Sequence, residues 1–499
     1  MVEKSIEEIN SKINDGSVNV VTAEEMVDIV SELGTENAAK EVDVVTTGTF
    51  GAMCSSGAFL NFGHAEPPIK FQKIWLNDVE AYAGLAAVDA YIGATQLSET
   101  AGMEYGGAHV IEDLVRGKTI DVHAKSYGTD CYPLKVLDTT LNINDLNQTT
   151  MVNPRNGFQK YNVATNSTGR TLHTYMSTLL PNHGNITYSG SGVLSPLSND
   201  PNYETIGTGT RIFIGGAQGY VVGEGSQHNP EVNFGTLMVQ GNLKDMNPDY
   251  IRGASFYGYG TSLYMGIGIP IPILNERMAE YTAVSDEDIV TNILDYGIQS
   301  RDRPKLREVT YAELKSGSVE LNGREVTTSP LSSFKTARQI AEECKDWIKN
   351  GEFFVNDPVY RLPNKGIFKP MKQTKKKPLV GEIMATDVVT IQQDNSFHEA
   401  AKKIMESTFD HLPVVSEDSK LVGIVTAWDI SKAVAEDKFN IVKDFMTKEA
   451  ITATTNEPID IAAHRIDQKE VSALPVVDDE NHVVGIITSN DISKLLASE

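Results

Sequence analysis

Cysteine is scarce in this chain, with three residues among 499. Three thiols cannot build a disulfide framework, and no CxxC pair is present to begin a zinc site or an iron–sulfur cluster. The histidines lack the i, i+4 spacing of a metal-binding helix, so the sequence indicates no metal site. Any chemistry of the cysteines must come from single reactive thiols.

Long hydrophobic segments are also absent. No run of about 18 uncharged apolar residues occurs. Residues 1–21 carry acidic side chains every few positions, instead of the apolar core of a signal peptide. We therefore expect a cytoplasmic protein that does not enter a membrane.

Basic residues are too few to balance the acidic ones. The chain has 43 Lys and Arg against 67 Asp and Glu, and its formal net charge is −24. Such a charge repels nucleic-acid phosphates, so nucleic acid is not an expected partner. The acidic residues are spread along the chain, which is typical of a solvated acidic surface.

One internal repeat defines the domain organisation. Five residues recur 62 positions later, and these are Met384, Pro413, Gly423, Thr426 and Asp429, repeated as Met446, Pro475, Gly485, Thr488 and Asp491. Each copy has buried strands and helices in the order β-α-β-β-α. We place the two copies at residues 379–438 and 441–499.

The segment before the repeat, residues 365–378, is basic and contains proline, which is typical of a solvated linker. The alternative is a basic patch for an acidic partner. Residues 1–364 then form a large N-terminal domain, which we interpret as α/β with an undetermined topology. Its predicted helices include residues 336–350 and the Ala-rich stretches 79–95 and 108–115.

The second buried strand of each repeat runs into Gly-x-x-Thr-x-x-Asp. The Thr and Asp lie at a strand end and a helix N-terminus, where they can bind phosphate or polar groups and a ribose diol. The paired motif resembles CBS domains. This resemblance implies that Thr426, Asp429, Thr488 and Asp491 bind an adenosyl ligand such as S-adenosylmethionine, AMP or ATP. The alternative is that they cap the closing helices of a dimerisation scaffold.

The three cysteines differ in their surroundings. Cys344 lies on the apolar stripe of a helix and is assigned to the core. Cys54 lies in a Gly- and Ser-rich turn, where backbone N–H groups can lower a thiol pKa. Cys131 lies on a loop after a strand, and the nearby cations that could stabilise its thiolate are His123, Lys125 and Lys135. Two loop cysteines favour reactive thiol chemistry over inert burial.

A Gly-rich run at residues 207–229 matches neither a Walker A loop nor GxGxxG, so a nicotinamide fold is unsupported. Its polar residues Arg211, Gln218 and His228 suit a small carboxylate substrate. Structural turns are an equally good interpretation.

The N-terminal motifs GAMCSSGAFLNFGH, SYGTDCYP, RIFIGGAQGYVVGEGSQHNP and MGIGIPIPILN resemble the archaeal homocysteine-biosynthesis family, the L-aspartate semialdehyde sulfurtransferases. The resemblance implies conversion of aspartate semialdehyde and sulfide to homocysteine through a cysteine persulfide, with Cys54 and Cys131 as the motif cysteines. We assign the persulfide to Cys131 and a resolving or relay role to Cys54.

The implied reaction needs two electrons and two protons beyond the exchange of oxygen for sulfur. The sequence shows no permanently bound cofactor, so the resemblance implies an external ferredoxin-type iron–sulfur protein. We also expect a homo-oligomer, a dimer. Because homocysteine leads to S-adenosylmethionine, the CBS pair would report this product back to the enzyme.

Two other functions remain open from the sequence. The chain could be a non-catalytic sensor in which the CBS pair modulates binding by the N-terminal domain. It could also be a CBS-gated cysteine enzyme, related in logic to inosine monophosphate dehydrogenase, and would then need a nicotinamide cofactor.

Overall fold

The computed structural model describes residues 2–157, 160–232, 234–300, 303–366, 369–371, 377–407, 410–436 and 441–498. The chain forms two compact units. The first contains Met1–Asn166, Thr171–Tyr296 and Pro304–Lys369, and the second contains Ser167–Arg170, Gly297–Arg303 and Pro370–Glu499. Residues 367, 368 and 372–376 of the predicted basic linker lie outside the described residues.

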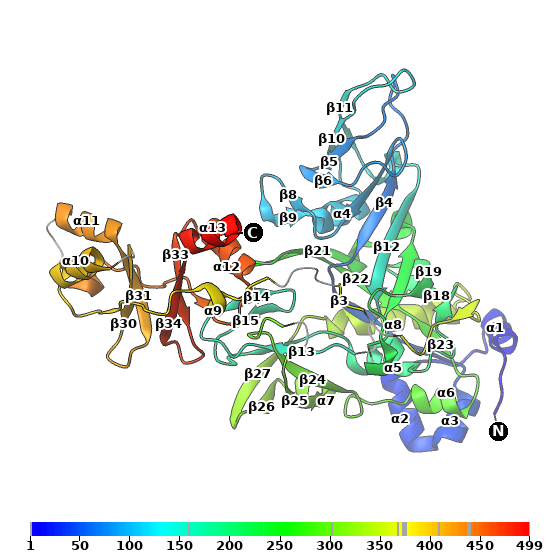
Figure 1. The fold of residues 1–499 in the computed structure, drawn as a ribbon. Coiled ribbons are helices and arrows are strands. Elements are labelled where there is room, and N and C mark those ends of the chain that lie inside the picture. Colours follow the sequence, from blue (N-terminus) through cyan, green and yellow to red (C-terminus); the bar gives the residue numbers. More distant parts are fainter. Residues whose placement is uncertain are drawn as a thin grey trace. The chain divides into compact units, whose positions relative to one another are not determined.

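The first unit is built largely of sheets, with helices packed on them (Figure 1). Its largest sheet has nine strands, in the order β21 (Ile251–Phe256), β22 (Gly260–Gly268), β18 (Arg211–Ile214), β19 (Ala217–Glu224), β20 (Leu237–Gly241), β12 (Thr149–Asn156), β4 (Gly57–Asn61) and β7 (Asp89–Gly93), with β3 (Thr49–Met53) paired to β22. All of these pairings are antiparallel.

Two six-stranded sheets extend this unit. The first has the order β11 (Val136–Leu141), β10 (Ile120–Lys125), β5 (Lys73–Leu76), β6 (Val79–Ala81), β8 (Leu97–Ser98) and β9 (Gly102–Gly106). The second has the order β25 (Lys305–Thr310), β24 (Val290–Asp295), β13 (Val163–Thr165), β16 (Ile186–Tyr188), β27 (Arg324–Pro330) and β26 (Ser318–Leu321).

Smaller sheets and eight α-helices complete the described part of this unit. The strands are β1 (Val20–Thr22), β2 (Val44–Thr46) and β23 (Pro270–Pro272) in one sheet, β14 (Leu172–Thr174) with β15 (Ser177–Leu179), and β17 (Gly207–Thr208) with β28 (Tyr360–Arg361). The helices are α1 (Ile6–Asp15), α2 (Ala23–Leu33), α3 (Thr35–Glu41), α4 (Gly107–Val115), α5 (Pro196–Asn199), α6 (Glu276–Tyr281), α7 (Tyr311–Lys315) and α8 (Phe334–Lys349).

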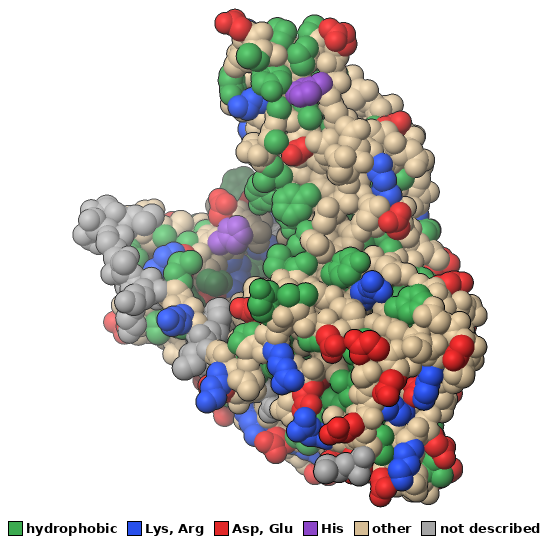
Figure 2. Space-filling view, turned by 90° about the vertical axis from the view of Figure 1, so that its right-hand side faces the viewer, with side chains coloured by type: hydrophobic (Ala, Val, Ile, Leu, Met, Phe, Trp, Pro, Cys, Tyr) green, Lys and Arg blue, Asp and Glu red, His purple; other side chains and the backbone are tan. Residues whose placement is uncertain are grey.

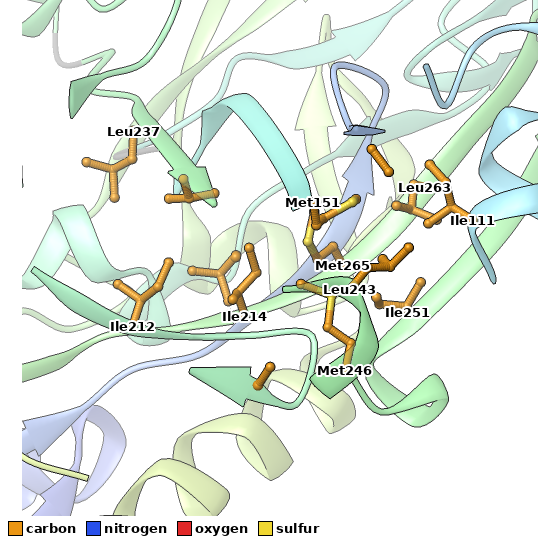
Figure 3. Packing of buried hydrophobic residues seen from close by; sticks show 14 of the residues in the cluster. Ile111, Met151, Ile212, Ile214, Leu237, Leu243, Met246, Ile251, Leu263 and Met265 are labelled. Atoms are coloured by element: carbon orange, nitrogen blue, oxygen red, sulfur yellow. The ribbon is translucent and has the colours of Figure 1, made fainter. Parts of the chain in front are cut away.

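The main hydrophobic core lies against the nine-stranded sheet. Figure 3 shows Ile111 of α4 beside Leu263 of β22, with Met151 of β12 and Met265 of β22 close by. These side chains are almost fully buried. Burying each contributes about 1.5–3 kcal/mol relative to exposure. This packing fixes the strand ends from which the candidate site is built.

Helix α8 confirms the predicted amphipathic helix near the end of the N-terminal domain. It begins after Ser333, whose hydroxyl accepts a hydrogen bond from the N–H of Thr336 and satisfies a free donor at the helix start. The buried stripe of the helix consists of Ala337, Ile340, Ala341, Cys344 and Ile348. The 3.6-residue period of these positions is what places them on one face.

The helix predicted at residues 79–95 is wrong, because this segment forms β6 and β7 instead. Alanine favours helices only weakly, and tertiary packing readily overrides that preference. Buried residues in the segment alternate with less buried ones, which is the period of a strand. The buried set is Val79, Ala81, Val88, Ala90, Ile92 and Ala94. The second Ala-rich stretch does form a helix, α4.

The second unit contains the two repeats, which show the predicted β-α-β-β-α order. The first repeat has β29 (Ile391–Gln392), α10 (Phe397–Glu406), β30 (His411–Val415), β31 (Leu421–Thr426) and α11 (Ala427–Glu436). The second has β32 (Ala453–Thr454), α12 (Ile459–Gln468), β33 (Ala473–Val477), β34 (Val483–Thr488) and α13 (Ser489–Ser498). A short helix, α9 (Val380–Ile383), precedes them.

The repeats exchange equivalent backbone contacts. Ala385 of the first repeat pairs with Ile486 of the second, and Thr447 of the second pairs with Ile424 of the first. Each contact is a pair of N–H···O bonds. The same positions therefore meet twice, which is the expected arrangement of a pseudo-symmetric pair.

Charged side chains are interspersed on the face shown in Figure 2, with Asp and Glu scattered among Lys and Arg. This face carries no single large patch of one sign. The distribution agrees with an acidic surface that interacts with water. Among the described residues, no helix combines the length and apolar character needed to cross a membrane.

Candidate active site

Cys54 lies in the tight turn that joins β3 to β4. The N–H of Ser56 donates to the carbonyl of Met53 across this turn, at 3.1 Å. A Cβ on Gly57 would lie 2.1 Å from the hydroxyl of Tyr91, so only glycine allows β4 to start here without displacing that ring. Because β3 pairs with β22 and β4 pairs with β12, the thiol is held between well-anchored strands.

Two hydroxyl groups contact the Cys54 thiol. Its Sγ donates to Oγ of Ser262 on β22 at 3.3 Å, and the hydroxyl of Tyr259 donates to Sγ at 3.8 Å. Tyr259 lies in the turn between β21 and β22. Burial raises the pKa of the Tyr259 phenol, and the neighbouring Cys54 raises it further. The Tyr259 phenol therefore keeps its proton and donates it in a hydrogen bond to the Cys54 sulfur.

The Cys54 thiol lines a cavity of about 290 Å³. This volume is at the lower end of the range for small-molecule pockets, so it suits a small metabolite. The other lining residues come from both the nine-stranded sheet and the segments around β13 to β16. They are Ala52, Met53, Ser55, Arg155, Tyr161, Tyr175, Met176, Ser189, Gln227, Tyr259 and Leu331.

Three tyrosines, Tyr161, Tyr175 and Tyr259, are among the residues that line this cavity. The Tyr175 hydroxyl lies 2.9 Å from that of Tyr296 and accepts a hydrogen bond from that of Tyr161 at 3.4 Å. The ring of Tyr175 also packs edge-on against Tyr259, with a centroid distance of 6.1 Å. The cavity thus combines a thiol with several hydroxyl donors that can orient a carbonyl or amino group.

Cys131 lies elsewhere, in the exposed loop between β10 and β11. Thr129 and Tyr132 close this loop by reciprocal backbone hydrogen bonds, and the Tyr132 ring stacks on His64 at 5.3 Å. Because His64 follows the far end of β4, about 13 Å of strand separates this loop from the Cys54 turn. The structure does not bring the two predicted cysteines into one cavity.

Two of the three cations proposed to stabilise Cys131 have other contacts. Nδ1 of His123 lies 2.6 Å from a carboxylate oxygen of Asp138, and Nζ of Lys125 lies 5.3 Å from the centre of the Trp75 ring. Cys131 is thus a solvent-facing thiol, whereas Cys54 is partly enclosed.

Cys344 is buried, as predicted, among Phe50, Phe213 and Ile340. Burial raises the pKa of its thiol far above the ordinary value. A protonated, enclosed thiol is a poor nucleophile.

The Gly-rich segment uses its polar side chains to hold the backbone. Nε2 of Gln218 donates to the carbonyl of Glu352 at 2.9 Å, and Arg211 reaches the carbonyl of Phe354 at 3.5 Å. The buried ring of His228 lies between the backbone of Thr236 and Pro363. These contacts match the structural-turn interpretation.

Sequence reasoning did not single out Arg155, Gln227 or Tyr259. They are far apart in the sequence. Arg155 and Tyr259 fall in none of the motifs described above, and Gln227 lies in the Gly-rich run, whose proposed polar residues were Arg211, Gln218 and His228. The one local signal was the Gly-Tyr-Gly turn at residues 258–260. Across the described ranges, no three His, Cys, Asp or Glu side chains gather closely enough to hold a metal ion.

In the CBS unit, the Thr and Asp residues of the repeated motif bond to each other. The Thr426 hydroxyl donates to Asp429 at 2.7 Å, and the Asp429 N–H donates back to Thr426 at 3.2 Å. Thr488 and Asp491 repeat the pattern at 2.6 and 3.2 Å. These pairs cap α11 and α13, as the scaffold interpretation requires.

The same motif borders a cleft of about 760 Å³. Thr426, Thr488 and Asp491 line it, together with His411 and Ser472, which are joined by a 2.8 Å hydrogen bond between the repeats. The capping role and a binding role are therefore compatible.

Comparison with known proteins identifies both parts of the chain. The family model described as homocysteine biosynthesis enzyme, sulfur-incorporation, matches residues 18–355. This chain belongs to that family. A CBS domain model matches residues 380–436 and 442–498, so the predicted α/β domain with a tandem CBS pair is confirmed.

Two similar relatives are named L-aspartate semialdehyde sulfurtransferase. The one from Methanosarcina acetivorans is 65% identical over 497 residues and covers 100% of this chain and 99% of the relative. The one from Methanocaldococcus jannaschii is 51% identical over 514 residues and covers 100% of both. A solved CBS domain pair, in complex with 5′-methylthioadenosine and S-adenosyl-L-methionine, is 42% identical over 25% of this chain and 98% of its own, with a TM-score of 0.24.

Proposed function

We propose that this protein converts L-aspartate 4-semialdehyde to L-homocysteine, and that Cys54 passes the sulfur to the aldehyde. The observation that carries the proposal is the position of Cys54, a thiol that lines a small cavity in a domain of the sulfur-incorporation family. The names of the two full-length relatives support the choice of substrate.

The balance of atoms and electrons defines what the reaction needs. An aldehyde, hydrogen sulfide, two electrons and two protons give the thiol and water. Forming a cysteine persulfide from sulfide passes two electrons to the oxidised form of an external electron carrier, and cleaving the sulfur–sulfur bond later takes two electrons from its reduced form, so the net requirement is unchanged. The chain has only three cysteines, too few for the four that usually ligate a cluster, so we propose a ferredoxin-type iron–sulfur protein as the external donor.

The residues around Cys54 fit the individual steps. The terminal sulfur of the Cys54 persulfide attacks the aldehyde carbon, and Tyr259 donates its proton to the carbonyl oxygen as that oxygen gains charge. Two electrons then cleave the sulfur–sulfur bond and release the Cys54 thiolate. Loss of water leaves a thioaldehyde, which the second electron pair reduces to the thiol.

The geometry favours a different division of labour from the one predicted for the two cysteines. A thiol that transfers sulfur to an enclosed substrate must line the enclosure, which Cys54 does. Cys131 is exposed, so we propose that it is an accessory thiol that exchanges sulfur with donors in solution.

Mass spectrometry of the intact protein after sulfane-sulfur treatment tests this assignment. We expect one added sulfur on Cys54 that disappears when aspartate semialdehyde and a reductant are supplied. Peptide mapping in Cys131→Ala should still find it. Substrate-dependent loss of sulfur from Cys131 in a Cys54→Ala variant would contradict the assignment and return the transfer step to Cys131.

We further propose that the CBS cleft binds an adenosyl ligand, S-adenosylmethionine, AMP or ATP, and thereby regulates turnover. Asparagine caps helices as well as aspartate does, so Asp491→Asn should keep α13 stable while it removes the negative charge offered to a ribose diol. Calorimetry tests all three ligands, and we expect about a tenfold loss of affinity for whichever of them the wild type binds. The control is Asp460→Asn, which lies on α12 in an exposed ion pair with Lys377. Equal binding by Asp491→Asn and the wild type, or no binding at all, would refute the proposal.

A further inference from the structure

Arg155 lies near the end of β12, at an irregularity in the strand. The pairing of β12 with β20 shifts register between Asn153 and Asn156, which is the signature of a β-bulge. Bulges re-aim side chains and are frequent beside active sites. Here the bulge accompanies the placement of Arg155 on the lining of the Cys54 cavity.

A buried amide ties this bulge to the Cys54 turn. Nδ2 of Asn153 donates to Oγ of Ser56 at 2.8 Å, and Oδ1 of Asn153 accepts from the N–H of Arg155 at 2.8 Å. Asn153 is fully buried. One side chain therefore holds both the turn that carries the thiol and the residue that carries the guanidinium.

The Arg155 guanidinium has spare hydrogen-bonding capacity. Its Nη1 donates to Oε1 of Gln227, while its Nε is buried without a hydrogen-bond partner among the described residues. A buried donor without a partner carries a free-energy cost, so such a group is expected to meet a ligand. The edge formed by Nε and the neighbouring Nη matches the two oxygens of a carboxylate.

The charges that line the cavity also favour an anionic ligand. Arg155 is the one charged side chain among the described lining residues, and no Asp or Glu is among them. The cavity therefore has an unbalanced positive charge close to Cys54. Arg155 also acts electrostatically on the Tyr259 phenol, where it lowers the pKa against the larger raising effect of burial.

We propose that Arg155 binds the α-carboxylate of the substrate and makes this site specific for α-amino-acid aldehydes. This inference rests on the proposed function and adds the part of the substrate that the enzyme recognises. With the carboxylate on Arg155, the aldehyde carbon, three carbon–carbon bonds away along the substrate, is directed at the sulfur on Cys54. A simple aldehyde would lack this anchor, so Arg155 is a specificity-determining residue.

The test compares substrates that differ only in the carboxylate. 3-Aminopropanal keeps the amine and the aldehyde of aspartate semialdehyde but lacks the carboxylate. We expect the wild type to prefer aspartate semialdehyde over 3-aminopropanal by about 10²-fold in kcat/KM. The reason is that 3-aminopropanal cannot form the charged hydrogen bonds between the carboxylate and Arg155. In Arg155→Gln this preference should fall below about tenfold, because kcat/KM should decrease for aspartate semialdehyde and stay unchanged for 3-aminopropanal. Arg155→Lys, which keeps the charge but not the fork, should be intermediate.

Binding of unreactive alcohols separates this inference from the reaction itself. Calorimetry with L-homoserine and 3-aminopropan-1-ol should show the same carboxylate preference in the wild type and its loss in Arg155→Gln, whether or not sulfur is transferred. The matched control is Arg116→Gln, an exposed arginine paired with Glu112. A native circular dichroism spectrum checks that each variant is folded, and persulfide formation on Cys54 is measured separately.

An unchanged preference in Arg155→Gln would overturn the inference. If the same variant also failed to form the persulfide while its circular dichroism spectrum stayed native, the anion bound by Arg155 would be the sulfur species. Loss of the binding preference together with absence of any turnover in the wild type would retain the carboxylate site and reject the proposed reaction.

Discussion

Replacement of Cys54 by alanine is expected to abolish homocysteine formation, with a loss of more than about 10³-fold in kcat. The Cys54 thiol forms the sulfur–sulfur bond of the persulfide and leaves when that bond is cleaved. Removing a covalent nucleophile typically lowers kcat by this factor or more. Cys54→Ser should be equally inactive, because its hydroxyl fits the space and keeps a contact to Ser262 but cannot carry a persulfide. Homocysteine released from aspartate semialdehyde, sulfide and reductant is the measurement.

Cys344→Ala is the matched control for this prediction. The Cys344 thiol is enclosed by the core, so its removal should lower thermal stability and leave the turnover of the folded enzyme intact. Cys131→Ala tests the accessory role, and we expect its turnover to be impaired at low sulfide and restored at high sulfide. Substantial homocysteine formation by Cys54→Ala would show that the cavity thiol does not transfer the sulfur.

The second large effect is expected for Tyr259→Phe, which keeps the ring and removes the hydroxyl beside Cys54. General acid catalysis typically contributes about 10²–10⁴-fold, so kcat should fall by that factor. Loading of Cys54 with sulfur should be unaffected, because that step needs no proton at the carbonyl oxygen. Single-turnover measurements from a preloaded persulfide isolate the step.

The pH dependence gives this prediction a second readout. The ordinary tyrosine pKa is about 10. Burial and the Cys54 thiol raise the pKa of Tyr259, and a raised pKa keeps the phenol protonated as the pH increases. The wild-type single-turnover rate should therefore not decrease through deprotonation of Tyr259 up to about pH 10. Tyr175→Phe, which alters a phenol of the same cavity without touching Cys54, is the control. Equal losses in both variants would assign the effect to the cavity's polarity and not to a proton from Tyr259.

Elements with regular local patterns were predictable from the sequence. The amphipathic stripe of α8 needs only a 3.6-residue period, and the CBS repeat is visible from the constant interval of 62 residues between equivalent positions of its two copies. The segment at residues 79–95 forms strands although its alanine content favours a helix, because its buried residues alternate and tertiary packing overrides a weak helix preference. Local periodicity is informative where one face of an element meets a core.

By itself, the sequence determined the tandem CBS repeat, the family resemblance and the burial of Cys344, and it predicted Cys54 and Cys131 as the two candidate reactive thiols. Only the tertiary structure decided that Cys54 lines a cavity while Cys131 faces solvent. It also brought Arg155 and Tyr259, about 100 and 200 positions further along the chain, to the same cavity. The physical reason is that antiparallel pairing sets which strand ends meet, and this pairing depends on the cooperative packing of a whole sheet and not on any local run of residues.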